Sequence, residues 1–423
     1  MMRTYKEEEL VRVAKRDNNT RRPYLLVNPL QGKHIPVSPA RSMELFEALS
    51  GVLSAACKGE KLLLIGFAET ATAIGAAVAA NCPEEVWYMH TTRECVAGAG
   101  QYLYFSEVHS HATEQKLIAD CLDEAVEHAD RIVFEEDEVT TGNTILNLIG
   151  CLKERYHGAE GLSFGILSIL NSMTDAALEH FRELNIPCLY LNRIEGRDYT
   201  EELEPYRYEA ERIHGCAGAE SGAVSVTMKT FPGKQNPRIG VLPKDYRRAC
   251  EVLAEVCVVE LTRLLTEEGA QESESQQSES QESESRQSES HQSESRQSAS
   301  QQSASPLSGK RLLVLGTEEF MYPALVAAEH LEREAGSGLV RFHATTRSPI
   351  LPSGEADYPL SSRYELRSVY DGDRTTYIYN LECYDAVLWL HDAPEADHQG
   401  ISSLSAALES AGCRKLFIGK WGD

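Results

Sequence analysis

The chain alternates short apolar runs with longer segments in which apolar residues recur every three or four positions. The short runs predict strands at residues 24–28, 61–66, 85–90, 131–134, 162–170 and 187–191. The longer segments predict helices at residues 42–57, 71–81, 114–129, 143–155, 174–185 and 246–267. Strands that alternate with helices predict an α/β fold, in which helices cover both faces of a mainly parallel sheet.

One segment, residues 271–305, breaks this pattern. It consists mainly of Gln, Ser and Glu in near-repeats of QSES, with no aromatic residue and no aliphatic residue larger than Ala. Such a composition buries too little apolar surface to offset chain entropy, so we expect disorder. A spacer is the main interpretation, and a phosphorylated regulatory segment is the alternative. The expected organisation is an α/β domain at 20–268, a disordered linker at 269–307 and a smaller α/β domain at 308–423.

The second domain resembles a shortened copy of the first. LLLIGFAE at 62–69 parallels LLVLGTEE at 312–319, and HTTR at 90–93 parallels HATTRSP at 343–349. A third pair of segments, 129–144 and 384–400, follows in the same order, which favours a degenerate duplication over chance likeness between two α/β strands. The second copy lacks a hydroxyl-rich turn and carries APEAD in its place.

Charge and cysteine content narrow the class of protein. The net charge of −24 argues against a nucleic-acid surface and against binding to anionic membranes. The eleven Cys residues include no Cys-x-x-Cys pair. That pattern favours reduced thiols in a cytoplasmic protein over a disulfide scaffold or a zinc site. We see no signal-peptide pattern at the N-terminus and no apolar stretch that reads as a membrane span.

The most informative stretch for function is RIVFEEDEVTTGNT at 131–144. Glu136 and Asp137 follow an apolar strand, and carboxylates there can accept hydrogen bonds from sugar hydroxyls. The turn that follows consists of Thr140, Thr141, Gly142, Asn143 and Thr144. Backbone N–H groups of such a turn, at a helix N-terminus, hold phosphate. The stretch therefore predicts a grip on ribose 5-phosphate, and the alternative is an ordinary strand-to-helix turn with a solvated acidic edge.

This stretch resembles the phosphoribosyl pyrophosphate loop of the type I phosphoribosyltransferases, with Glu136 and Asp137 on the acid pair. Glu135 stands where an apolar residue is usual. The chain as a whole is similar to a bacterial family in which a phosphoribosyltransferase domain precedes a TRSP domain. The further segments that carry this likeness are GKHIP at 32–36, EVHSH at 107–111 and TRSP at 346–349. That family is associated with stress-related and tellurium-resistance gene neighbourhoods.

The resemblance implies an enzyme that uses phosphoribosyl pyrophosphate, Mg²⁺ and an unknown small-molecule acceptor. Mg²⁺ is expected near Glu136 and Asp137, bound indirectly through substrate or water. A regulatory protein that binds the same ligand without turnover is the alternative, and a phosphorylase running the reaction in reverse is a third interpretation. Such domains often pair, so a homodimer is also an expectation.

Two further loops are expected to hold pyrophosphate. The loop at 66–72 contains Ala68, Glu69 and Thr70 and is the candidate pyrophosphate loop, although a plain turn looks similar. Arg93 lies at the end of the next predicted strand and is expected to bind pyrophosphate through two hydrogen bonds. Its alternative role is a surface salt bridge with Glu94.

Three other places complete the expected site. His109 and His111 lie in a segment that resembles the family's catalytic flap, and we expect substrate contacts there because no third metal ligand is nearby. Lys33 and His34 fall in the hood near the N-terminus. They are candidates for recognising an acidic group, and the alternative is that they form a solvated turn. Arg347 and Ser348 are candidates for binding an anion on a rigid turn, or for a structural role.

Overall fold

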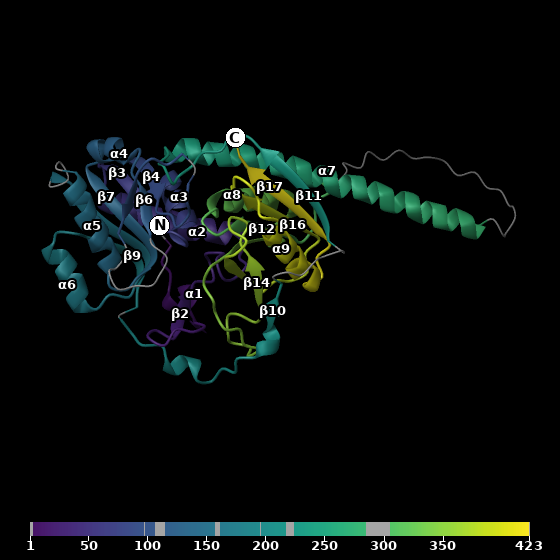
Figure 1. Ribbon diagram of the computed structural model, residues 1–423, viewed down its shortest axis with the longest axis horizontal. Coiled ribbons are helices and arrows are strands. Elements are labelled where there is room, and N and C mark those ends of the chain that lie inside the picture. Colours follow the sequence, from purple (N-terminus) through teal and green to yellow (C-terminus); the bar gives the residue numbers. More distant parts are fainter. Residues whose placement is uncertain are drawn as a thin grey trace.

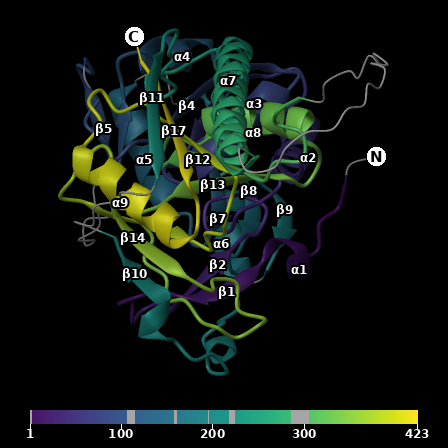
Figure 2. The same ribbon diagram turned by 90° about the vertical axis from the view of Figure 1, so that its right-hand side faces the viewer.

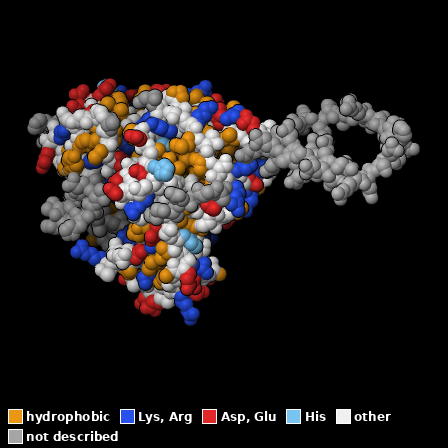
Figure 3. Space-filling view, turned by 45° about the vertical axis from the view of Figure 1, so that its right-hand side comes forward, with side chains coloured by type: hydrophobic (Ala, Val, Ile, Leu, Met, Phe, Trp, Pro, Cys, Tyr) orange, Lys and Arg blue, Asp and Glu red, His pale blue; other side chains and the backbone are white. Residues whose placement is uncertain are grey.

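The fold consists of two halves, each built around a five-stranded sheet. The computed structural model describes residues 3–96, 98–105, 115–156, 161–194, 196–216, 224–284 and 305–422. Figure 1 shows the first half in purple, blue and teal and most of the second in green to yellow. Helix α7 begins beside the first half, runs along the second and projects beyond it. Within the described residues, no helix combines the length and the apolar character that crossing a bilayer requires. Acidic, basic and apolar side chains are interspersed over the face shown in Figure 3.

The first sheet is parallel throughout, in the order β4-β3-β7-β8-β9. Its strands are β3 (Lys61–Gly66), β4 (Glu85–His90), β7 (Arg131–Val139), β8 (Ser163–Asn171) and β9 (Cys188–Arg193). Helices α2 (Pro39–Ala56) and α3 (Ala71–Asn81) pack on one face. The other face is covered by α4 (Leu122–His128), α5 (Asn143–Arg155) and α6 (Asp175–Glu183). Because both faces are covered, β3 and the first part of β7 are almost continuously apolar.

The second sheet is also parallel, in the order β11-β17-β16-β12-β13. Its strands are β11 (Ser225–Phe231), β12 (Leu312–Thr317), β13 (Val340–Thr345), β16 (Ala386–His391) and β17 (Lys415–Trp421). Helices α8 (Tyr322–Ala335) and α9 (His398–Ser410) cover its opposite faces. The elements β12-α8-β13-β16-α9-β17 repeat the order β3-α3-β4-β7-α5-β8 of the first half.

Each half also inserts an antiparallel hairpin after its edge strand. The hairpins are β5 (Tyr102–Tyr104) with β6 (Lys116–Ile118), and β14 (Arg363–Arg367) with β15 (Thr375–Tyr379). The repeated order agrees with the duplication expected from the sequence. The single helix predicted at 114–129 is wrong in its first part, because β6 precedes the short helix α4.

Segments that belong to the second half begin before the low-complexity segment, within the range expected for the first domain. β10 (Ile213–Gly215) pairs with β14, and β11 pairs with β17, so both strands belong to sheets of the second half. Helix α7 (Pro243–Glu284) lies along α8 (Figure 2) and continues into the Ser/Gln/Glu segment. Residues 285–304 lie outside the described residues. The low-complexity segment therefore leads from α7 to β12. Both elements pack against the second half, and α7 also contacts α3 and β4 of the first half.

One apolar core extends through both halves. Buried side chains of α2 and α3 share it with those of α7 and α8. Tyr246 of α7 is buried, and its ring lies 5.4 Å from that of Tyr322 and 6.3 Å from that of Trp421. At the N-terminus, α1 (Glu7–Leu10) leads into the hairpin of β1 (Arg12–Lys15) and β2 (Tyr24–Val27). Each sheet is thus held against the other half by buried apolar contacts.

Candidate functional site

The acidic cluster lies on β7, and its first member is a core residue. Glu135 is fully buried, and neither carboxyl oxygen has a hydrogen-bond partner among the described residues. Burial, together with the neighbouring acids, raises the pKa of Glu135 well above its usual value. This shift favours the neutral form of the side chain, which suits a position where an apolar residue is usual.

The acids available to a ligand are Glu136 and Asp137. Glu136 is partly exposed and accepts no hydrogen bond within the described part of the chain. Burial and the charges of Asp137 and Glu138 raise the pKa of Glu136 to about 8. Burial also raises the pKa of Asp137, although Lys33 opposes that shift. Neither carboxyl forms an ion pair within the described residues, so both remain able to bind a ligand.

Glu138 has a different role from its two neighbours. It accepts a hydrogen bond of 2.7 Å from the guanidinium of Arg22 and another of 2.7 Å from the hydroxyl of Ser172. These contacts tie β7 to the segment that leads into β2 and to the end of β8. Glu138 is therefore already satisfied within the protein.

The turn between β7 and α5 depends on Gly142. Its φ is +71°, and an added Cβ would lie 2.4 Å from Cζ of Phe181, so only glycine fits. Gly142 is also the N-cap of α5 and supplies no capping side chain. Thr140 and Thr141 beside it are exposed, as is Asn143. The N–H of Asn143 donates to Oγ1 of Thr141 at 3.3 Å, and no charged side chain of the described residues caps the helix N-terminus, so an anion can bind there.

The loop after β3 is held by contacts from several segments. Its Ala68 N–H donates a 2.8 Å hydrogen bond to Oγ1 of Thr91, and the Ala68–Glu69 peptide is cis. The Glu69 carboxylate is buried and lies 3.2 Å from Nζ of Lys33, which also donates to Oγ1 of Thr70 at 2.7 Å. This loop is therefore held in place by a buried ion pair between Lys33 and Glu69.

The hood residues do not form a solvated turn, contrary to that alternative. Lys33 and His34 are only 4% and 6% exposed. Burial, followed by the charge of Lys33, holds the pKa of His34 well below its usual value, so His34 is neutral. Lys33 is engaged with Glu69. Nε2 of His34 is buried without a hydrogen-bond partner among the described residues, so the expected recognition of an acidic group stays a prediction.

Arg93 does not form the alternative salt bridge with Glu94. Its backbone N–H donates to Oε1 of Glu319 at 2.7 Å, and its Nε is buried without a partner among the described residues. Glu94 instead binds the guanidinium groups of Arg347 and Arg374. The Arg93 side chain keeps hydrogen-bonding capacity for a ligand.

Arg347 and Ser348 have structural contacts. The Arg347 guanidinium lies between Glu94 of the first half and Glu318 of the second, 2.7 Å from the latter. Ser348 donates its N–H to Oγ1 of Thr346 at 3.2 Å, and its carbonyl accepts from Tyr379. This arrangement favours the structural role over anion binding. His109 and His111 lie outside the described residues.

Sequence reasoning missed Arg16, which lies close to the acids. Its backbone N–H donates to the carbonyl of Pro23 at 2.7 Å, which places it at the β1–β2 hairpin. Its guanidinium has no hydrogen-bond or ion-pair partner in the described ranges. Burial and the charge of Arg22 lower the pKa of Arg16, while Glu138 and Asp137 act in the opposite direction. No motif marks this arginine, because only folding brings the hairpin to β7.

The site offers oxygen ligands but no complete metal cage. Within the described part of the chain, no three His, Cys, Asp or Glu side chains gather to hold a metal ion by themselves. Mg²⁺ in proteins is usually bound by one or two carboxylates together with water and substrate phosphates. The unpartnered Glu136 and its neighbour Asp137 fit that ligand pattern.

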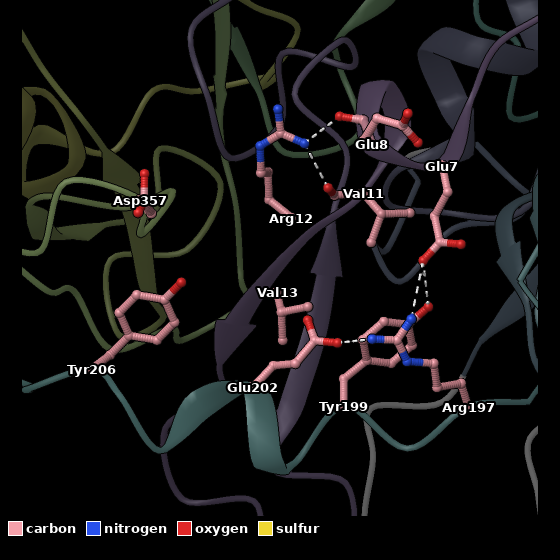
Figure 4. Close-up of a pocket in the computed structure, with 10 residues that line it drawn as sticks. All are labelled: Glu7, Glu8, Val11, Arg12, Val13, Arg197, Tyr199, Glu202, Tyr206 and Asp357. Atoms are coloured by element: carbon pink, nitrogen blue, oxygen red, sulfur yellow. Dashed lines mark hydrogen bonds and ion pairs between the residues drawn. The ribbon is translucent and has the colours of Figure 1, made fainter.

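A separate pocket lies on the N-terminal segment. Its volume is about 320 Å³, and charged residues such as Arg12, Glu202 and Asp357 line it (Figure 4). Arg197 lies between Glu7 and Glu202 there. None of the residues predicted for the site lines this pocket.

Two family models match the chain. Residues 10–197 match the model described as "Phosphoribosyl transferase", and residues 280–408 match "TRSP domain C terminus to PRTase_2". None of the curated proteins matches.

Solved structures similar to this chain include several phosphoribosyltransferases. The adenine phosphoribosyltransferase of Rhodothermus marinus is 16% identical, with a TM-score of 0.32 over 44% of this chain and 96% of that one. The orotate phosphoribosyltransferase of Aeropyrum pernix is 15% identical, with a TM-score of 0.29 over 46% and 91%. The adenine enzyme of Trypanosoma brucei, solved with AMP, pyrophosphate and ribose 5-phosphate, is 14% identical, with a TM-score of 0.29 over 44% and 77%.

Proposed function

The chain belongs to the family in which a phosphoribosyl transferase domain is followed by a TRSP domain, and we propose that it transfers a phosphoribosyl group from phosphoribosyl pyrophosphate to a small-molecule acceptor. The observation that carries this proposal is a pair of acids, Glu136 and Asp137, that form no ion pair within the described residues and are followed by a helix N-terminus at Gly142 with no charged cap. A ribose phosphate carries the hydroxyls and the anion that these two features bind.

Each part of the site has a role in this reaction. Glu136 and Asp137 hold the ribose hydroxyls, and residues 140–144 hold the 5-phosphate. The loop at 68–70 and Arg93 bind the leaving pyrophosphate. Mg²⁺, when bound near the two acids, supplies positive charge to the pyrophosphate oxygens. Charge builds up on the leaving group in the transition state, so its stabilisation lowers the barrier.

Substitution of Asp137 tests the proposal. Isothermal titration with Mg²⁺ and phosphoribosyl pyrophosphate is expected to show binding to the wild type. Asp137→Asn should bind about 10- to 100-fold more weakly, the loss typical of a hydrogen bond to a charged group. Glu127→Gln, on the exposed surface of α4, is the matched control and should bind normally. No binding by the wild type, or equal binding by Asp137→Asn, would refute the proposal.

The acceptor is identified by a separate measurement. Mass spectrometry of small molecules that co-purify with the protein should give acceptor candidates, each of which is then tested for pyrophosphate release. Binding without pyrophosphate release for every candidate would instead indicate a regulatory protein.

We place the activity in the cytoplasm, since all eleven cysteines are free.

A further inference from the structure

The loop after β3 is held from the second half of the molecule. The Glu69 carboxylate accepts a hydrogen bond from the hydroxyl of Thr346 at 3.3 Å and another from the N–H of Arg347 at 3.4 Å. Both donors belong to the loop after β13. The Glu69 carboxylate also lies 3.2 Å from Lys33, so three groups fix its position.

The same contact occurs a second time with the halves exchanged. The Glu319 carboxylate, in the loop after β12, accepts a hydrogen bond from the hydroxyl of Thr92 and another from the N–H of Arg93, both at 2.7 Å. Arg238 lies 3.0 Å from Glu319 and takes the place of Lys33. Glu69 and Glu319 occupy matching positions in the two sequence copies.

Short backbone pairings repeat this exchange. Val37 of the first half pairs with Phe342 of β13, through hydrogen bonds of 3.0 and 2.8 Å. Val241, which precedes α7, pairs with Tyr88 of β4 through bonds of 3.0 and 2.8 Å. Contacts that recur with the partners exchanged are the mark of a two-fold interface between like subunits. Here both sides of that interface lie in one chain.

In the second half, side chains of the protein itself bind the acid that corresponds to Asp137. Asp392, the counterpart of Asp137, binds Arg238 at 2.7 Å and Lys234 at 3.2 Å and accepts from the hydroxyl of Tyr370 at 2.6 Å. These partners lower the pKa of Asp392, whereas burial raises the pKa of Asp137. The charge of Asp392 is therefore already balanced by Arg238 and Lys234, so it does not require a bound metal ion.

The helix that would hold a phosphate in the second half is also capped. The Asp397 side chain accepts hydrogen bonds from the N–H groups of Gln399 and Gly400, at 2.8 and 3.4 Å. A carboxylate therefore occupies the N-terminus of α9, where α5 of the first half has only the neutral Thr141 hydroxyl, which accepts from the N–H of Asn143 at 3.3 Å. Both features that would bind a ribose phosphate are closed in the second half.

We propose that the second half is a ligand-silent copy that takes the place of a partner subunit and positions both pyrophosphate loops of the first half. Thr346 and the backbone of Arg347 hold the loop that carries Glu69, and Glu319 holds the loop that carries Arg93. These are positioning residues, because they act on the loops and not on the ligand. The inference rests on the proposed function, which assigns pyrophosphate to the two loops.

The test compares two hydroxyl groups that bind buried carboxylates. Thr346→Val removes the hydroxyl that holds Glu69, and Tyr370→Phe removes the one that binds Asp392 in the silent crevice. Thr346→Ser keeps the hydroxyl. The binding of Mg²⁺ and phosphoribosyl pyrophosphate is measured by titration, and the melting temperature is measured for every variant.

We expect one binding site per chain in the wild type. Thr346→Val should weaken binding about 2- to 10-fold, the effect of one hydrogen bond, whereas Thr346→Ser and Tyr370→Phe should bind like the wild type. A lower melting temperature in both Thr346→Val and Tyr370→Phe, with weaker binding only in the former, separates positioning from general loss of stability.

Three results would overturn the inference. Two sites per chain would show that the second half is not silent. Unchanged binding by Thr346→Val, with Asp137→Asn still defective, would remove the positioning role and leave the proposed function intact. No binding by the wild type would overturn both together.

Discussion

At the scale of single residues, the site depends on burial, which raises the pKa values of the acids on β7. Glu136 and Asp137 stand out in the sequence because they follow an apolar strand and precede a Gly-containing turn. Their order is local, so sequence reasoning could reach them. The burial of Lys33 and the unpartnered guanidinium of Arg16 depend on segments that meet only in the folded chain. A local pattern carries no information about such neighbours.

The raised pKa of Glu136 predicts that binding is coupled to proton release. Below its pKa of about 8, Glu136 is mainly protonated in the free protein. A ligand that brings Mg²⁺, or that donates hydrogen bonds to the carboxylate, lowers that pKa, so a proton leaves on binding. Affinity should therefore rise from pH 6 to pH 8, by at most about tenfold per pH unit for one proton, and level off above.

Titration in two buffers with different ionisation enthalpies measures this proton release directly. Glu136→Gln cannot ionise and provides the control, for which the residual binding should lose its rise between pH 6 and pH 8. Equal heats in both buffers at pH 7 would contradict the assignment of Glu136 to the ligand.

At the scale of elements, apolar periodicity predicted the first sheet well. β3, β4, α3 and α5 begin and end where the pattern places them, because β3, β4 and α3 are largely buried apolar runs and α5 has a regular apolar face. β7 runs past the apolar run at 131–134 to Val139, since pairing with β8 continues through the acids. The role of β11 was out of reach, because its partner β17 lies at the far end of the chain.

Loss of the Phe231 side chain should show that β11 belongs to the second sheet. Phe231 is buried, and its ring centroid lies 6.3 Å from that of Phe417 on β17. Phe231→Ala is expected to cost about 3–5 kcal/mol of the free energy of unfolding, as for other buried aromatic residues. Thr230→Ala, at the exposed neighbouring position, should change it by less than about 0.5 kcal/mol. Urea denaturation measures both, and equal costs would contradict the buried role of β11.

At the scale of the whole molecule, the order of repeated motifs revealed the duplication, because each copy kept its strand sequences. The boundary between the halves was harder to locate. The Ser/Gln/Glu segment marks the clearest change in composition, yet the strands β10 and β11 before it pair with strands after it. Amino-acid composition indicates which segments cannot form a core, but it does not indicate which core the neighbouring strands β10 and β11 join.

A cut in the low-complexity segment should leave the molecule in one piece. If a protease site is engineered into residues 290–296, the two fragments are expected to elute together in size-exclusion chromatography. Tyr246 of α7 and Phe231 of β11 lie on the first fragment but are buried against the second. Fragments that separate without denaturant would contradict the shared core.

The position of that segment, between α7 and β12, has a consequence for how the gene can change. A short tandem repeat gains and loses units readily during copying, and both flanking elements are anchored in the same half. Each doubling of a loop's length costs only about 0.6 kcal/mol in closure entropy. Versions of this protein with many or few QSES units should therefore fold alike and keep the same crevice, so its length is free to drift between strains.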